Sequence, residues 1–144
     1  MRLQEPSSPG DFEKYYLLRW EVLRKPWNQP RGTEKDENEN SSVHIMALDE
    51  KEECIGVSRL QFNTPQEAQV RFMGVRDDQQ GKGVGKKLMQ YLEEKAKEKG
   101  AEKIVLQARE NAVPFYLSIG YTITEKTFLL WGIIQHFKME KKVV

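Results

Sequence analysis

The chain has 144 residues, a length that fits one domain built around a single hydrophobic core, and we expect residues 1–144 to form that domain. Hydrophobic residues make up 38% of the chain and charged residues 31%, which excludes a disordered protein and favours a soluble globular one. The 23 basic and 22 acidic residues leave a net charge of +1, so no chain-wide basic field points to nucleic acid.

The first third of the chain predicts one helix and one polar segment. Large side chains recur at helical spacing from Phe12 to Leu23. Ser7 or Ser8 can cap this helix, and Pro26 ends it. Residues 28–42 contain no apolar side chain, so they predict an exposed loop or a short polar helix.

The middle of the chain predicts three strands and then a helix. Residues 43–49 and 54–63 alternate apolar and polar side chains, and a short turn connects them to a third strand over residues 68–75, as in consecutive antiparallel hairpins. After these strands the spacing of apolar residues changes. They lie four apart from Val84 to Ala96, which predicts an amphipathic helix of about four turns that Gly100 can end.

The last third predicts a parallel strand, a short helix and two further strands. Residues 103–108 are short and apolar, as in a buried parallel strand reached by a right-handed crossover. A short helix is expected over residues 112–117, and two strands broken near Gly132 follow it. The predicted class is therefore mixed α/β, with antiparallel hairpins first, one parallel crossover next and a closing strand pair.

The stretch QQGKGVGKK, residues 79–87, joins the third strand to the long helix. A dinucleotide fingerprint fails because Lys86 or Leu88 stands at its third glycine, and a P-loop fails because Gln80 and Lys87 stand at its first and last positions. A helix N-terminus still offers free N–H groups and a positive dipole, and glycines let an anion approach the backbone. The loop therefore suits a pyrophosphate, with a mobile connection as the alternative.

Two motifs lie on either side of the crossover. Residues 80–85 read QGKGVG, and residues 110–121 read ENAVPFYLSIGY. They resemble the Q/R-x-x-G-x-G/A signature and the N/A-x-x-F/Y-Y-x-x-x-G-F/Y segment of the GNAT superfamily of acyl-CoA-dependent N-acetyltransferases. The resemblance covers residues 68–121 firmly and implies a GNAT-like twisted mixed sheet of six to seven strands flanked by about four helices.

The resemblance implies an enzyme that transfers an acetyl group from acetyl-CoA directly to a primary amine. The strand before the signature would offer backbone groups to the pantetheine arm, and the signature amides would bind the pyrophosphate. Tyr116 would protonate or hydrogen-bond the departing thiolate, with a plain core aromatic as the alternative. Many members carry an asparagine at the position of Arg109, whereas this chain has Asn111. The implied coenzyme contacts are Met73, Gly74, Val75, Gln80, Gly81, Lys82, Gly83, Val84, Gly85, Lys86, Asn111, Phe115 and Tyr116.

The general base is less clearly indicated. The histone acetyltransferase branch of the family has a glutamate at the position of Gln69, and neither Gln69 nor Arg71 is a good base. The candidates that remain are His44, His136, Glu110 or a chain of water molecules. His136 resembles the late histidine of some small bacterial GNAT proteins, so we assign it to catalysis together with the tyrosine.

Two groups of residues could surround the acceptor. In the GNAT layout the segment after the first helix covers the acceptor site, so its acidic residues could hold a cationic amine, although a solvated loop is the preferred interpretation. The tryptophans could line an acceptor pocket or anchor the core. The acidic residues are Glu34, Asp36, Glu37 and Glu39, and the tryptophans are Trp20, Trp27 and Trp131.

Two other functions remain as alternatives. A non-catalytic acyl-CoA-binding or sensing module would explain the absent carboxylate at Gln69. A nucleic-acid binder could use Lys82, Lys86 and Lys87, but the near-neutral charge argues against it. We therefore expect a small-molecule or peptide amine acceptor, no nucleic-acid or membrane partner, and a monomer or homodimer.

Cysteine usage and hydropathy indicate the compartment. Cys54 is the one cysteine, so an internal disulfide is excluded and a reducing environment is expected. No segment approaches the roughly 20 apolar residues of a membrane span, and the N-terminus lacks an apolar run of signal-peptide length. We expect a cytoplasmic protein. No histidines or cysteines stand at ligand spacing, so no metal is expected.

Overall fold

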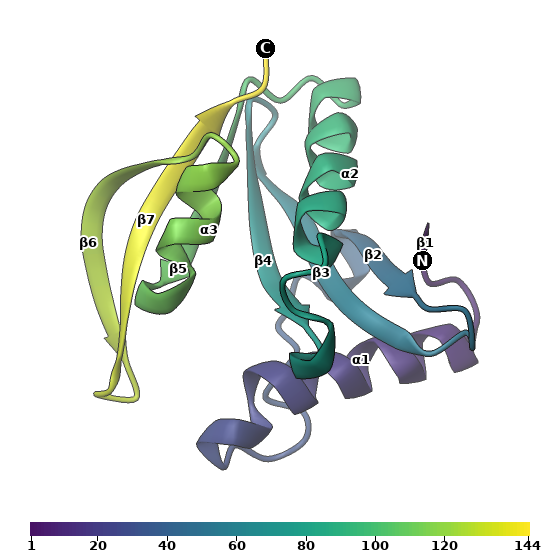
Figure 1. Ribbon diagram of the computed structural model, residues 1–144. Helices are drawn as coiled ribbons and strands as arrows, with labels where there is room; N and C mark the ends of the chain where they lie inside the picture. The colour runs from purple at the N-terminus through teal and green to yellow at the C-terminus, as the bar shows by residue number, and fades with distance from the viewer.

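One mixed sheet of seven strands forms the centre of the molecule (Figure 1). The computed structural model describes all residues from Met1 to Val144. The strand order across the sheet is β1-β2-β3-β4-β5-β7-β6, and only β4 and β5 run parallel. The strands are β1 (Arg2–Gln4), β2 (Val43–Leu48), β3 (Cys54–Thr64), β4 (Glu67–Val75), β5 (Lys103–Arg109), β6 (Thr122–Leu130) and β7 (Ile134–Lys142), and the helices are α1 (Pro9–Leu23), α2 (Val84–Glu98) and α3 (Val113–Ser118).

The predicted fold class is confirmed. Antiparallel hairpins come first, and α2 connects the parallel pair β4 and β5. There are three α-helices rather than about four, because the other helical segments are single 3₁₀ turns of three residues. The sequence does not predict β1, since a three-residue strand is too short for an alternating pattern. No helix of the structure is both long and apolar enough to cross a membrane.

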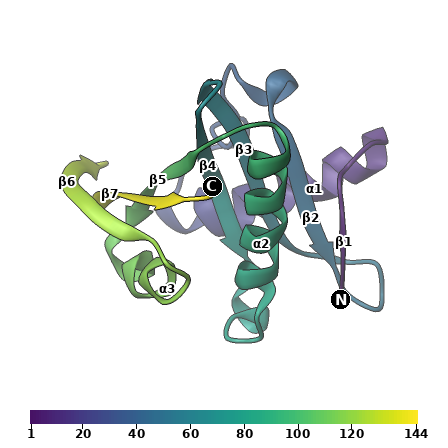
Figure 2. The same cartoon turned by 90° about the horizontal axis from the view of Figure 1, so that it is seen from above.

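Helices cover both faces of the sheet, with α1 on one side and α2 and α3 on the other (Figure 2). The apolar stripe of α2 packs into the larger core through Val84 and Leu88. Gly56 on β3 makes this approach possible, because a Cβ there would lie 2.7 Å from Cγ1 of Val84. On the other face, a Cβ at Gly74 would lie 3.3 Å from Cγ1 of Val22 on α1. Two glycines thus set how closely the two long helices pack on the strands.

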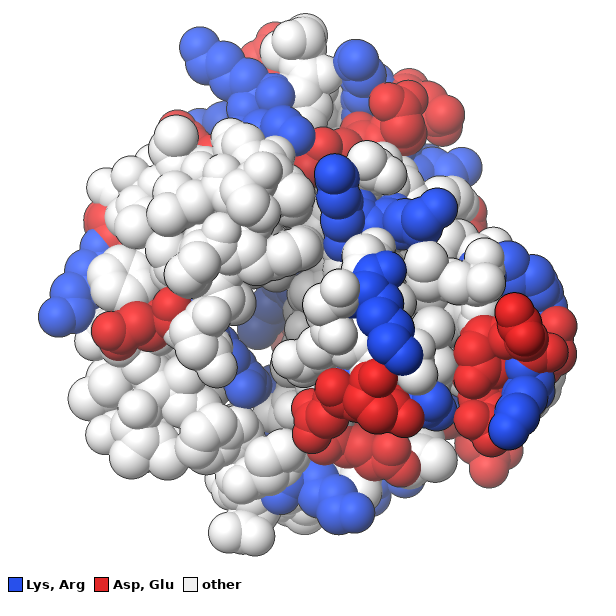
Figure 3. Space-filling view, in the orientation of Figure 1, with Lys and Arg blue, Asp and Glu red and all other residues white.

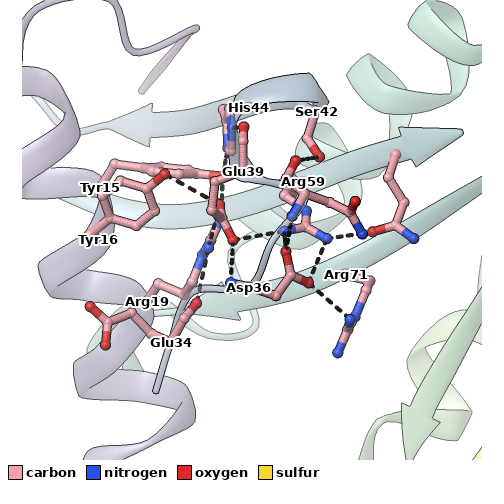
Figure 4. Close-up of polar contacts among 12 residues, drawn as sticks. Tyr15, Tyr16, Arg19, Glu34, Asp36, Glu39, Ser42, His44, Arg59 and Arg71 are labelled. Atoms are coloured by element: carbon pink, nitrogen blue, oxygen red, sulfur yellow. Dashed lines mark hydrogen bonds and ion pairs between the residues drawn. The ribbon is translucent and has the colours of Figure 1, made fainter. Parts of the chain in front are cut away.

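Buried ion pairs attach the segment of residues 28–42 to the sheet and to α1 (Figure 4). Arg59 on β3 is fully buried and donates to carboxylate oxygens of Asp36 at 2.6 and 3.0 Å and of Glu39 at 2.7 Å. Arg19 on α1 is also fully buried and donates to Glu39 at 2.9 Å and to the backbone oxygen of Glu34 at 3.0 Å. The segment is therefore part of the packed structure.

This network corrects the expectation of a solvated loop. The side chain of Glu34 is 1% exposed, and burial opposes ionisation of Asp36 while hydrogen bonds from Arg59 still hold its pKa below the usual value. The suggestion that these acids bind a cationic amine is also wrong for Asp36 and Glu39, because arginines already neutralise them. The sequence pattern missed the network because Arg19 and Arg59 are far from the loop along the chain.

We expect the substitution Arg59→Leu to lower the free energy of unfolding by roughly 3–5 kcal/mol, because it leaves two partly buried carboxylates without their cation. Urea unfolding followed by circular dichroism measures this. Arg2→Leu is the control: Arg2 pairs with Glu52, but its side chain is 54% exposed, so stability should barely change. Equal losses in the two variants would contradict a special role for the buried network.

Candidate active site

The parallel pair β4 and β5 separates part-way along its length. The two strands pair from Glu67–Val70 on β4 to Lys103–Leu106 on β5, and no pairing continues beyond these residues. Both strands nevertheless extend further, to Val75 and Arg109. Figure 1 shows the two ribbons spreading apart toward these ends. The edge of β4 that faces the gap is therefore free of strand partners and can bind another molecule through its backbone.

A bulge in β4 lies beside this separation. Val57 pairs with Gly74 and Arg59 with Arg71, so Phe72 and Met73 together stand opposite the single residue between them on β3. Phe72 has a φ of 57°, a left-handed conformation that is rare for a bulky side chain. Such strain costs on the order of 1–3 kcal/mol and persists only where the surroundings impose it.

Arginines surround the ring of Phe72 and hold it in place. Four guanidinium carbons lie 4.4–5.6 Å from the ring centroid. Each cation–π contact contributes about 0.5–2 kcal/mol, so together they offset the backbone strain. The four residues are Arg19, Arg24, Arg59 and Arg71.

A pocket of about 280 Å³ occupies the gap between the strands. Its walls come from the end of α1, the bulged part of β4, the free end of β5, α3 and the β6–β7 pair. Figure 3 shows a hollow between the part of the surface over α3, β6 and β7, which carries few charges, and the part over α2. Of the predicted site residues, Met73, Tyr116 and His136 line the pocket.

Tyr116 reaches the pocket from α3. Its side chain is 6% exposed and packs against the rings of Phe115 and Tyr121, with centroid distances of 5.0 and 5.8 Å. Burial raises the pKa of the Tyr116 hydroxyl, and no neighbouring charge opposes this. The hydroxyl therefore stays protonated at neutral pH and can donate a proton or a hydrogen bond into the pocket.

His136 reaches the pocket from β7. Its Nδ1 lies 3.0 Å from the backbone oxygen of Ile134, so Nδ1 carries the proton and Nε2 has a free lone pair. The ring stacks on Phe128 at 4.3 Å, which fixes its orientation. Burial lowers the pKa of His136, and Arg109 lowers it further. The imidazole is therefore neutral near pH 7 and able to accept a proton.

The other candidate bases lie elsewhere. The two ring nitrogens of His44 are occupied: Nε2 donates to the backbone oxygen of Glu39 at 2.7 Å, and Nδ1 lies 2.8 Å from the hydroxyl of Tyr15. Glu110 is exposed and does not line the pocket. Gln69 does line it but has no basic group. His136 is the one candidate whose free nitrogen can serve the pocket.

The glycine loop before α2 has the geometry of an anion cradle. Gly81 and Gly83 have φ values of 78° and 84°, and a Cβ at either position would meet no atom within 4 Å. Gly83 is the N-cap of α2, and no side chain caps the first N–H groups, so these donors are available to a ligand. Gln80 ties the loop to β4 by donating to the backbone oxygen of Val75 at 3.3 Å. The residues fit a pyrophosphate.

The remaining predicted coenzyme contacts differ in how much of each residue a ligand can reach. Val84 is buried in the core, so only its backbone faces a ligand. Gly85 lets α2 approach α3, since a Cβ there would lie 3.2 Å from Cζ of Phe115. Lys82 and Lys86 are exposed. Asn111, Gly74 and the three tryptophans do not line the pocket between β4 and β5.

Sequence reasoning missed two features of the pocket. The bulge at Phe72 was not predicted, although Phe72 and Met73 are consecutive apolar residues that interrupt the alternation of β4. Arg24 and Arg109 also line the pocket. Arg109 could have been found, because it stands where the GNAT motif commonly has an asparagine, whereas Arg24 at the end of α1 carries no motif.

Comparison with known proteins agrees with this geometry. Residues 12–121 match the model of the Acetyltransferase (GNAT) family. The chain belongs to this family. A relative in Bacillus subtilis (strain 168), the uncharacterized N-acetyltransferase YjcF, is 37% identical over 127 residues, which cover 88% of this chain and 89% of YjcF. The resemblance inferred from the two motifs is therefore confirmed.

Solved structures of low sequence identity share the fold. An aminoglycoside 6'-N-acetyltransferase complexed with coenzyme A superimposes with a TM-score of 0.82 at 16% identity, covering 100% of this chain and 98% of that one. Escherichia coli ElaA gives a TM-score of 0.83 at 19% identity, covering 97% and 98%. As a GNAT protein, the chain is an acyl-CoA-dependent N-acyltransferase.

We expect Gly83→Ala to weaken binding of coenzyme A by about 10-fold or more, because the added methyl group stands where an anion approaches the helix N–H groups. Isothermal titration calorimetry measures the affinity. Gly100→Ala is the matched control: Gly100 has a φ of 92° and equally open surroundings, but it lies beyond the other end of α2. Both variants should lose similar stability. Weakened binding in both, or in neither, would contradict the assignment of the loop.

Proposed function

We propose that the protein transfers the acetyl group of acetyl-CoA directly to a primary amine. The supporting observation is that a proton donor and a proton acceptor, Tyr116 and His136, line one pocket at the separation of β4 from β5. Tyr116 belongs to the core on the α2 side. His136 pairs with Arg109, and strand alternation directs both side chains to the α1 side. The proton donor Tyr116 and the proton acceptor His136 therefore approach the gap from opposite faces of the sheet.

The coenzyme, when bound, supplies an activated acyl thioester; the pocket residues handle charge and protons. A backbone N–H of the bulged segment at Met73 hydrogen-bonds the thioester oxygen as negative charge develops there. His136 Nε2 accepts a proton from the amine as the N–C bond forms. Tyr116 donates its proton to the sulfur as the C–S bond breaks, so one proton is removed and one supplied.

No covalent enzyme intermediate takes part in this scheme. Cys54 lies on β3 and does not line the pocket. Burial raises the pKa of its thiol to about 12, so it is not an activated nucleophile. Direct transfer within one ternary complex is the simplest use of these residues.

Release of coenzyme A in the presence of a panel of primary amines tests the proposal as a whole. A thiol-reactive dye measures the released coenzyme. We expect release above the rate of hydrolysis with at least one class of amine, and mass spectrometry should show acetylation of its nitrogen. Tight binding of acetyl-CoA without transfer to any amine would instead favour a sensing module.

Tyr116→Phe should lower kcat by about 100-fold or more and leave coenzyme affinity nearly unchanged, because it removes a proton donor needed only as the C–S bond breaks. Steady-state kinetics and calorimetry measure the two quantities. Tyr121→Phe serves as the control, since that hydroxyl donates to Glu93 at 3.0 Å and lies outside the pocket. An unchanged kcat in Tyr116→Phe would remove the tyrosine from the mechanism.

The pH profile of kcat/KM should report His136. The imidazole must be neutral to accept a proton, and its pKa lies below the usual 6.5, so activity should fall only as the pH drops below that value. His136→Gln should lose about 100-fold or more in kcat and should also lose this acidic limb. His44→Gln is the control and should keep the fall in activity at acidic pH. If His136→Gln keeps that fall as well, another residue is the base.

A further inference from the structure

The pocket carries positive charge and no negative charge. Three arginines, Arg24, Arg71 and Arg109, are among its sixteen lining residues, and none of the sixteen is an aspartate or glutamate. They come from three different elements: the end of α1, β4 and the end of β5. Guanidinium groups that converge from separate elements on one pocket require an explanation, since like charges repel one another.

Two of these arginines lack a counter-ion. Arg71 pairs with Asp36 at 3.0 Å. Arg24 and Arg109 form no ion pair. Both donate to the backbone oxygen of Leu23, at 3.0 and 3.1 Å, and Arg24 Nε also donates to the backbone oxygen of Thr33 at 3.0 Å. Burial lowers the pKa of both, and Arg109 and Arg71 lower that of Arg24 further by repulsion, against which Glu34 acts only weakly. Keeping partly buried cations unpaired is costly unless a ligand supplies the anion.

These arginines stand apart from the coenzyme loop. Arg71 is in register with Arg59, which packs toward α1, and Arg109 is in register with His136. The glycine loop begins α2, on the opposite face of the sheet. The unpaired guanidiniums thus lie on the same face as the proposed base, from which an acceptor amine would approach.

We propose that the acceptor is an amine that also carries an anionic group, a carboxylate or a phosphate, which Arg24 and Arg109 bind. The inference rests on the proposed acetyl transfer and adds the class of acceptor. Guanidinium groups suit both anions, because their N–H donors can form paired hydrogen bonds with two oxygens. Leu23, Phe128 and Leu130 line the same pocket and provide apolar contacts for the rest of the acceptor.

Matched acceptors test this class by kinetics. Free α-amino acids are compared with their α-amides, and O-phosphoethanolamine with ethanolamine, so that each pair differs in the anion; spermidine represents cationic acceptors. We expect kcat/KM to be about 10- to 100-fold higher for the anionic member of the preferred pair, the range of a charge-assisted hydrogen bond. Preference for the carboxylate or the phosphate pair identifies which anion is bound. Equal or faster transfer to the amides, ethanolamine or spermidine would overturn the inference and leave acetyl transfer intact.

Binding without an acyl donor gives a readout independent of turnover. The rings of Trp131 and Trp27 lie 5.6 and 5.9 Å from the guanidinium carbons of Arg24 and Arg109, so anion binding should change tryptophan fluorescence. The probes are the free α-amino acids of the kinetic test and O-phosphoethanolamine. Arg109→Gln and Arg24→Gln should weaken binding by about 10-fold or more, whereas Arg2→Gln, at the far edge of the sheet, should not.

The outcomes separate the two proposals. Saturable anion binding that Arg109→Gln abolishes, without coenzyme release from any amine, would support the anion site and contradict acetyl transfer. Transfer that is indifferent to the anion, with no fluorescence change, would contradict the anion site alone. Where Arg109→Gln fails to fold, Arg109→Lys takes its place: it keeps the charge, loses the paired geometry and should still weaken binding.

Discussion

The separation of β4 from β5 is the constraint on which the site depends. The strands pair over four residues on each side and then part, so the sheet contains an edge in its middle rather than only at its rim. A free internal edge would be costly if it were buried without partners, and here it opens to a pocket. The bulge at Phe72 accompanies this separation, and four arginines around its ring stabilise the rare backbone conformation.

The buried and partly buried arginines of this region differ in whether a carboxylate pairs with them. Arg19 and Arg59 are neutralised by Asp36 and Glu39, and this neutralisation holds the acidic segment against the sheet. Arg24 and Arg109 face the pocket without such partners. The same residue type is therefore structural in one place and available to a ligand in the other. The presence of a paired carboxylate determines which role an arginine has, because a buried guanidinium that is already neutralised gains little from a further anion.

The two histidines also differ in their hydrogen-bond partners. Both stand on strands, and nothing in their immediate sequence separates a base from a structural residue. His44 uses both nitrogens within the network, whereas His136 keeps Nε2 free because its other nitrogen donates to Ile134. The strand pattern could place each residue on its element, but hydrogen-bond partners from distant parts of the chain determine what each imidazole can do.

The pattern of neighbouring residues in the sequence was enough to predict most of the helices and strands, though not β1, and the glycine loop. Alternation predicted the hairpins, helical spacing predicted α2, and the glycines of residues 81–85 identified an anion cradle, because these properties depend on neighbouring residues in the chain. The acidic segment, the bulge at Phe72 and the arginines of the pocket could not be predicted in this way. Each depends on residues that come together from separate elements: Arg59 pairs with Asp36, four arginines surround Phe72, and Arg24 and Arg109 both donate to Leu23. The motifs thus indicated the donor of the acyl group, whereas the arginines that we propose bind the acceptor come together only in the tertiary structure, because three separate elements meet at the pocket.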